Sequence, residues 1–216
     1  MERTIKVTGK ANIAVAPDTI QLLIDLSGIK ESYDQSRELS ISCSCHIQQA
    51  IQSLGLDKRS LKTRSYSIDA KYDTIQNRDK SWNKKFLGYS FNHQMKLEFP
   101  IDNELLGKVI HALNDSPIRP GISINYTIKS PASIQNELLA KAVADSATKA
   151  MVMAKAAGVT LAEVVSIDYS WGEIDILHRY NTDMTDANMC YESSSIDLTP
   201  EDIDLSDTVT IVWSLK

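Results

Sequence analysis

The sequence predicts an α+β fold in which helices cover antiparallel sheet. Several segments alternate apolar and polar residues with the period of a half-buried strand, and two longer segments repeat apolar residues at helical spacing. The clearest alternation runs from Thr4 to Leu26, where two such strands are joined by the turn signal Ala16-Pro17-Asp18-Thr19. We therefore expect the chain to begin with an antiparallel hairpin.

The two strands of this expected hairpin each have one apolar face. On the first strand the polar side chains of Lys6, Thr8, Lys10 and Asn12 alternate with an apolar row. The apolar rows comprise Ile5, Val7, Ala11, Ile13 and Val15 on the first strand and Ile20, Leu22, Ile24 and Leu26 on the second. Successive strand side chains point to opposite faces, so these rows are predicted to face the core.

A helix and two further strands are expected next. Leu39, Cys43, Ile47, Ala50, Ile51 and Leu54 fall at helical spacing, and Gly55 is a typical helix stop. Alternation predicts strands over residues 64–72 and 88–99, with 73–85 as a polar loop between them. Apolar side chains dominate one row of the second strand, and His93 lies in that row.

The second half of the chain repeats these patterns. Asp102 is a plausible cap for a short helix that ends at Asn114, and a one-sided strand is expected over 122–128. Residues 133–157 form the longest predicted helix, with Gly158 as its stop and a Lys141–Asp145 pair on its outer side. The expected stripe of that helix is Leu139, Val143, Ala147, Ala150, Ala154 and Ala157. Strands over 165–171 and 205–215 complete the set.

Length and charge constrain the organisation. The 216 residues are enough for one domain over 1–216 or for two lobes that share a sheet. The net charge of −5 is uneven, because residues 173–207 carry ten acidic residues and one arginine. Within that region, 173–204 has no sustained periodicity and is expected to be an acidic irregular excursion.

Apolar run length, the N-terminal residues and the cysteine count indicate the cellular compartment. No apolar run is long enough to span a membrane. Met1-Glu2-Arg3 leads at once into the first strand, which leaves no room for a secretion signal and indicates a cytoplasmic or already processed protein. Three cysteines cannot form a closed disulfide framework, which favours a reducing compartment.

Two clusters of side chains are candidates for binding a metal ion or a nucleic acid. Cys43, Cys45 and His46 include soft metal ligands, but only Cys43 and His46 share a helical face, so a buried helical cysteine is the simpler interpretation. A second cluster mixes bases with aromatics as a nucleic-acid binder does: Arg78, Lys80, Trp82, Lys84, Lys85 and Phe86. A solvated loop explains that composition equally well, and we predict no nucleic-acid partner.

A group of acidic residues and the four histidines are candidates for calcium binding and for catalysis. Glu201, Asp202 and Asp204 offer oxygen ligands for calcium but lack the spacing of an EF-hand loop. The histidines, His46, His93, His111 and His178, stand in no nucleophile motif. We therefore predict no catalytic, cofactor-binding or metal-binding residues and no cofactor.

Several motifs together resemble the SIMPL family, which includes bacterial periplasmic immunogenic proteins. They are Val7-Thr8-Gly9-Lys10-Ala11, Val15-Ala16-Pro17-Asp18, Leu54-Gly55-Leu56, Gly88-Tyr89, the alanine-rich run from Ala140 to Ala150 with Ala157-Gly158, and Val165-Ser166-Ile167. The resemblance covers nearly the whole chain. It implies an α+β fold with helices on antiparallel sheet, self-association in some members, and links to envelope integrity or oxidative stress. No catalytic residues are implied.

Three functions remain open from the sequence. The first is a non-enzymatic bacterial SIMPL-domain protein that forms a homo-oligomeric scaffold or binding module in a stress-related or envelope role. The second is a small-molecule binder or hydrolase with a site between the sheet and the acidic excursion, for which His93 or His178 beside a carboxylate would be the sign. The third is a signalling adapter with a protein partner, which an exposed apolar patch would favour.

Overall fold

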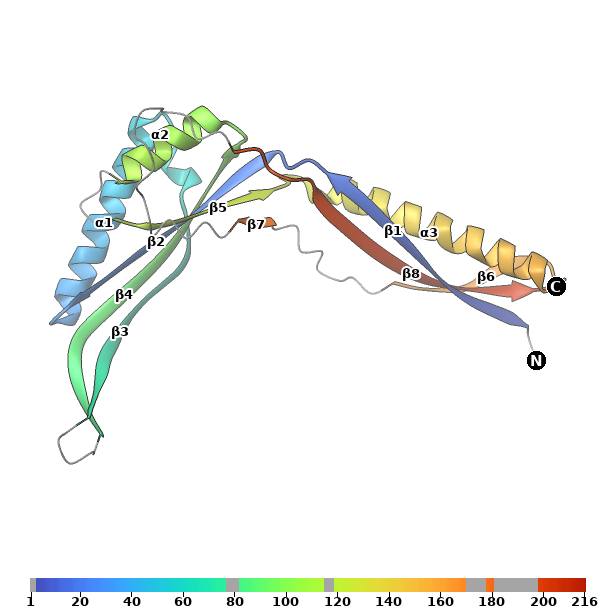
Figure 1. The fold of residues 1–216 in the computed structure, drawn as a ribbon, viewed down its shortest axis with the longest axis horizontal. Helices are drawn as coiled ribbons and strands as arrows, with labels where there is room; N and C mark the ends of the chain where they lie inside the picture. The colour runs from blue at the N-terminus through green and yellow to red at the C-terminus, as the bar shows by residue number, and fades with distance from the viewer. Residues whose placement is uncertain (1–2, 77–81, 115–118, 170–177, 181–197) are drawn as a thin grey trace. The chain divides into compact units, whose positions relative to one another are not determined.

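The computed structural model describes residues 3–76, 82–114, 119–169, 178–180 and 198–216, with the backbone alone at 75–76 and 178–180 (Figure 1). The chain divides into two compact units. Unit 1 comprises residues 1–18, 127–178 and 200–216, and unit 2 comprises 19–126 and 179–199. Both units combine helix with antiparallel strands, which confirms the α+β class.

Unit 1 contains a sheet with the strand order β1 (Thr4–Val15), β8 (Ile203–Leu215) and β6 (Leu161–Asp168). Helix α3 (Pro131–Ala156) packs mainly on β1 and β8 and touches β6 only marginally. The apolar side chains between helix and sheet form one core: Ala11, Ile128, Leu138, Ala142, Ile203, Leu205, Val209 and Ile211.

Unit 2 is built around a second sheet with the strand order β3 (Lys62–Gln76), β4 (Trp82–Pro100), β2 (Thr19–Lys30), β5 (Gly121–Thr127) and β7 (His178–Tyr180). Helices α1 (Tyr33–Ser53) and α2 (Asn103–Asn114) accompany it, with a 3-10 turn, η1, at Lys58–Ser60. Ile20, Leu22, Ile24 and Leu26 of β2 are all fully buried in its core, as the alternation predicted.

The expected hairpin of the first two strands is wrong. β1 pairs with β8 in unit 1, whereas β2 pairs with β4 in unit 2. Asp18 explains why the turn signal misled: its N–H donates to the Thr127 carbonyl at 3.1 Å, and its carboxylate accepts from the Lys129 N–H at 2.8 Å. Asp18 therefore serves a contact with a distant segment of the chain. Alternation predicts which face of a strand is buried but not which strand is its neighbour.

Helix ends follow local capping chemistry. α1 begins six residues before the predicted Leu39, because Ser32 and Gln35 form a reciprocal capping box. Gly55 ends it with φ +81°, a left-handed conformation that other residues rarely adopt. Asp102 caps α2 as predicted, with its carboxylate accepting from the Leu105 N–H at 2.9 Å.

The buried stripe of α3 differs from the prediction in its first half and at its last residue, since Ala157 is exposed and lies just beyond the helix. The observed stripe is Leu138, Ala142, Ser146, Ala150 and Ala154, so Leu139, Val143 and Ala147 lie on its flank. The expected Lys141–Asp145 pair is also wrong, since Lys141 pairs with Glu137 and Lys149 with Asp145. A serine in the stripe broke the apolar pattern, and its burial has a specific cause described below.

The predicted loop 73–85 is largely strand. β3 and β4 remain paired as far as residues 76 and 82. Asp73, Thr74, Lys84 and Lys85 are exposed, so this part of the ribbon buries neither face and shows no apolar period. Residues 77–81 lie outside the described chain.

Candidate functional site

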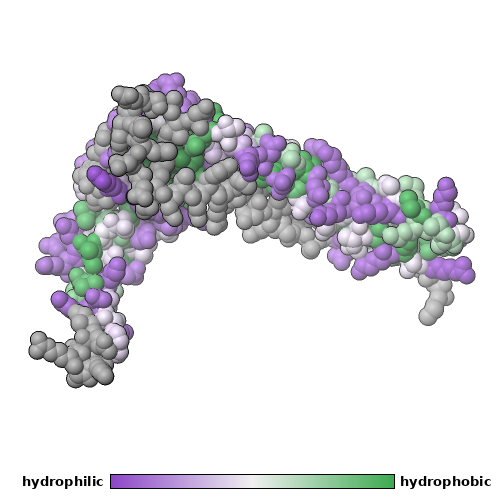
Figure 2. Space-filling model, in the orientation of Figure 1, coloured by the Kyte–Doolittle hydropathy of each residue, from purple (hydrophilic) through white to green (hydrophobic). Residues whose placement is uncertain are grey.

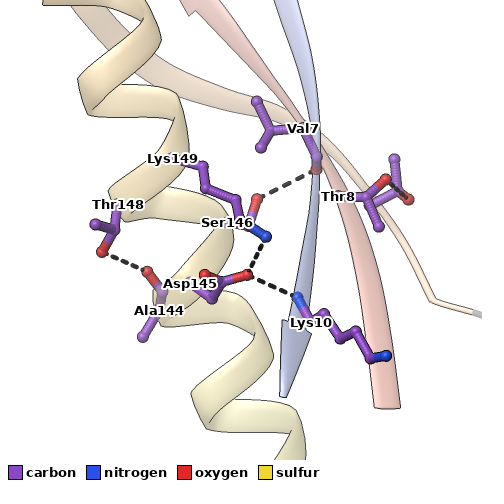
Figure 3. Close-up of polar contacts among 9 residues, drawn as sticks. Val7, Thr8, Lys10, Ala144, Asp145, Ser146, Thr148 and Lys149 are labelled. Atoms are coloured by element: carbon purple, nitrogen blue, oxygen red, sulfur yellow. Dashed lines mark hydrogen bonds and ion pairs between the residues drawn. The ribbon is translucent and has the colours of Figure 1, made fainter. Parts of the chain in front are cut away.

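The two edges of the unit 1 sheet differ in how they are covered. On β1, the Lys10 N–H donates to the Asp145 carboxylate of α3 at 2.8 Å, and the buried Ser146 hydroxyl donates to the Val7 carbonyl at 3.2 Å (Figure 3). Gly9 makes this approach possible, because a Cβ there would lie 2.0 Å from the Ala142 carbonyl oxygen. Helix α3 therefore engages the β1 edge with its own side chains.

Asp145 is held as a carboxylate by its neighbours. The Lys149 ammonium, at 2.7 Å, and the Lys10 N–H lower its pKa below the ordinary value. A charged acceptor bonds an edge amide more strongly than a neutral one does. Sequence reasoning missed this contact, although a glycine inside an alternating strand is a known sign of close backbone approach.

The β6 edge is uncovered in the part of the chain that the structure describes. β8 lies on one side of β6, and the sheet ends there. Val164 pairs with Trp213 of β8, and Ile167 pairs with Ile211. Val164 and Ile167 therefore lie on the same face of the sheet as the core side chains of β8, but α3 makes little contact with β6. Their exposed fractions are 44% and 58%, and that of Val165 is 51%. This apolar edge, Val164, Val165 and Ile167, is called the β6 edge below.

His93 lies buried between two hydroxyl groups. Its Nδ1 is 2.9 Å from Ser44 Oγ and its Nε2 is 2.9 Å from Thr63 Oγ1. Ser44 donates its own proton to the Ser40 carbonyl, so Nδ1–H donates to Ser44 and Nε2 accepts from Thr63. Burial lowers the histidine pKa. Both partners are hydroxyls rather than carboxylates, an arrangement typical of a satisfied core histidine.

The cysteine–histidine cluster on α1 is dispersed. Cys43 is buried, and burial raises its thiol pKa against a smaller lowering from a backbone hydrogen bond. Cys45 is exposed, and His46 Nδ1 lies 2.7 Å from the Ser42 carbonyl, a contact within its own helix. Across the described residues, no three His, Cys, Asp or Glu side chains gather closely enough to hold a metal ion.

The acidic candidates lie at the start of β8. Glu201, Asp202 and Asp204 are exposed and flank the buried Ile203. The rest of the excursion falls largely outside the described residues, as does the side chain of His178. The suggested small-molecule or hydrolase site beside the excursion therefore lies beyond what the structure describes.

The basic–aromatic cluster falls partly on β4. Trp82, Lys84, Lys85 and Phe86 are exposed on that strand, while Arg78 and Lys80 are outside the described residues. The rings of Tyr33, Tyr89, Phe86 and Tyr72 make successive contacts along one path, with centroid separations of 5.5–5.8 Å. Sequence reasoning missed this continuity, because Tyr33 comes from α1 and Tyr72 from β3.

An open hollow of about 670 Å³ lies beside the N-terminal half of α1. Ile29, Leu39 and Leu87 give it apolar walls, and Lys30, Glu31 and Glu38 line it with charge. Its volume is that of a small-molecule site. Its openness makes it a surface groove rather than an enclosed pocket.

Comparison with known proteins gives relatives of limited similarity. The chain is 25% identical over 167 residues to proteins named 26 kDa periplasmic immunogenic protein from Brucella melitensis and from Brucella abortus. Each alignment covers 76% of this chain and 65% of the relative, so somewhat less than two thirds of each Brucella protein is matched.

Among the described helices, none combines the length and apolar character needed to cross a membrane. The family described as SIMPL, protein of unknown function (DUF541), matches residues 5–213. That match includes the strands and helices of both units, and the chain therefore belongs to the SIMPL family.

Proposed function

We propose that this protein is a non-catalytic scaffold that self-assembles through the β6 edge. The observation that carries the proposal is the contrast within one sheet: α3 engages β1, whereas β6 presents exposed apolar residues on an edge that none of the described residues covers. Uncovered strand edges are templates for pairing with another chain. Charge often protects strand edges that stay single, and β6 does carry Glu163 and Asp168, but the exposed side chains of Val164, Val165 and Ile167 between them are apolar.

The geometry favours a two-fold contact between copies. Of the two edges of the unit 1 sheet, β1 is engaged by α3, so within this sheet β6 is the edge that can pair with β6 of another copy. Such a contact is isologous, with the two strands antiparallel across a two-fold axis. The assembly should therefore be a dimer or a larger even multiple built with additional interfaces.

Helix α3 of unit 1 also exposes apolar side chains. Met151 follows Val143 and Ala147 at four-residue spacing on the flank of α3, and it is 54% exposed. Strand pairing alone buries little area, and a stable interface needs roughly 1,200 Å² or more in total. Side chains on this flank of the helix supply the kind of surface that the additional burial requires.

Static light scattering of the full chain tests the proposal. The parent should have a mass that is an even multiple of 24.0 kDa at micromolar concentration, also in high salt. Val165→Lys combined with Ile167→Lys should reduce that mass, because each charge would be buried without a partner. Val152→Lys is the matched control, since Val152 is 65% exposed on α3 and lies outside the β6 edge.

Two results would contradict the proposal. One is a monomeric parent at every concentration and salt level. The other is an assembly that the β6 variant leaves intact, which would place the interface elsewhere. Circular dichroism of each variant separates loss of assembly from loss of folding.

The cellular role is the less direct part of the proposal. We favour an exported, envelope-associated location over a cytoplasmic one, supported by the periplasmic names of the Brucella relatives. A stress-related role is supported by family resemblance alone. Fractionation of the source cell tests the location, and peroxide sensitivity of a deletion strain tests the role. A cytoplasmic protein and an unaffected deletion strain would each refute the corresponding part.

A further inference from the structure

The β3–β4 hairpin extends past the end of the neighbouring strand. The last residue of β2, Lys30, pairs with Tyr89 of β4, whereas β3 and β4 stay paired through residues 76 and 82. Residues 72–76 and 82–86 therefore form a two-stranded ribbon, called the arm below (Figure 1). An isolated two-stranded ribbon is only marginally stable in water. The side chains on the surface of the arm therefore indicate what the arm could contact.

One face of the arm is aromatic. Tyr72 is paired with Phe86, and Lys84 and Trp82 follow on the same face because alternate residues of a strand share a face. Trp82 is 64% exposed and Tyr72 is 56% exposed. Phe86 contacts Tyr89, and Tyr89 contacts Tyr33 of α1. These six residues are called the aromatic stripe. Figure 2 shows hydrophobic and hydrophilic residues side by side in this part of unit 2.

The arm is also where positive charge gathers. The described residues 71–76 and 82–89 contain three lysines and one aspartate, a net charge of +2, so the remainder of the chain carries −7. Lys71, Lys84 and Lys85 are described and exposed, and Asp73 pairs across the ribbon with Lys85. The arm therefore attracts an anionic partner, while the rest of the protein repels one.

We propose that the aromatic stripe docks on an anionic phospholipid surface. Tryptophan and tyrosine suit the boundary between headgroups and acyl chains, because each has an apolar ring and a polar atom. Lysine can rest its methylene stem on apolar surface while its ammonium meets a phosphate. Exposed aliphatic residues beside the stripe, Leu87 and Ile29, add surface that lipid can bury.

The ring geometry favours lipid over nucleic acid. Tyr72 and Phe86 meet at an interplanar angle of 62°, Phe86 and Tyr89 at 75°, and Tyr89 and Tyr33 at 89°. Successive rings are thus turned edge to face, whereas single-stranded nucleic acid is held on open ring faces that stack with bases. Leu87 and Ile29 also have no π face on which a base could stack.

Vesicle flotation with the full chain tests this proposal. The parent should float with vesicles of phosphatidylcholine mixed with phosphatidylglycerol, bind pure phosphatidylcholine vesicles weakly, and detach in high salt. Trp82→Ser with Tyr72→Ser, and separately Lys84→Glu with Lys85→Glu, should each weaken binding by roughly tenfold or more. Val152→Ser and Lys155→Glu on α3 are the matched apolar and charged controls, and both should bind like the parent.

The emission of Trp82 gives a second readout. Transfer of its exposed ring to the lipid boundary should shift tryptophan fluorescence to the blue on addition of anionic vesicles, and Trp82→Phe should remove most of that shift. Absence of binding to anionic vesicles overturns the proposal, as does equal loss in the α3 controls. Binding of a single-stranded oligonucleotide through Trp82, without vesicle binding, would identify the stripe as a nucleic-acid surface instead.

Discussion

Gly9→Ala probes the contact that closes the β1 edge. The added Cβ would lie 2.0 Å from the Ala142 carbonyl oxygen, 2.7 Å from the Ser146 nitrogen and 2.8 Å from the Ser146 Cβ. Ordinary contact begins at 3.4 Å, so strand and helix would have to separate by more than 1 Å. Two of the three opposing atoms belong to the helix backbone, which cannot rotate aside as a side chain can.

The cost of that separation combines a packing loss with a hydrogen-bond loss. Overpacking of a closely packed contact costs about 1–3 kcal/mol. The buried Ser146 hydroxyl would lose the Val7 carbonyl, at a cost of about 1 kcal/mol. Alanine restricts the unfolded chain and returns about 0.4–1 kcal/mol. The free energy of unfolding should therefore fall by about 1–3.5 kcal/mol.

Urea unfolding followed by circular dichroism measures this loss. Gly121→Ala is the matched control, because the nearest atom to its added Cβ is the Asp25 Cβ at 3.5 Å, an ordinary contact. The control should lie within about 0.5 kcal/mol of the parent. If Gly9→Ala is as stable as the control, the close approach of α3 to β1 is not a feature of the folded protein.

Three further outcomes are expected. Ile24→Asp should destabilise the protein by several kcal/mol, since Ile24 is fully buried and the new charge has no partner, and an unchanged melting temperature would contradict this burial. Burial lowers the pKa of His93 in the folded protein below its ordinary value of 6.5. The unfolded chain therefore binds a proton at this histidine more readily than the folded chain does. The free energy of unfolding should then be highest above pH 6.5 and should fall as the pH drops below 6.5. His93→Gln should flatten that pH dependence in urea melts between pH 7.5 and 5, whereas an equal slope would show that another group titrates. Elemental analysis of protein purified without chelator should find no stoichiometric transition metal, and a full equivalent would overturn that prediction.

Burial faces could be predicted from the sequence because they depend on local alternation. Ile20 to Leu26 and the lysines of β1 lie on the predicted faces. Strand partners could not be predicted, since β1 pairs with β8 about two hundred residues away and nothing in a two-residue period identifies that partner. The helix stops at Gly55 and Gly158 were predictable because each needs a positive φ.

The exposure of the candidate surfaces depends on which helices and strands pack against them. The apolar pattern of one segment does not contain that information. Val165 and Ile167 were correctly assigned to a strand, yet their exposure follows from how little α3 contacts β6. Ser146 looked like a polar interruption of an apolar stripe until its bond to Val7 accounted for it. The aromatic stripe likewise joins residues from α1, β3 and β4, so its continuity exists only in the fold.

Disulfide trapping along β6 tests most directly whether copies join at this edge. In a background with Cys45 and Cys190 replaced by serine, single cysteines are placed at each position from 163 to 168, and buried Cys43 is left in place. Near the two-fold axis of an antiparallel contact, equivalent residues of the two copies lie about 4.5–5.5 Å apart, within the Cα separation that a disulfide spans. We predict covalent dimers on mild oxidation at one or two of these positions and none with Val152→Cys on α3. Dimers at none of the β6 positions, or equally at position 152, would contradict it.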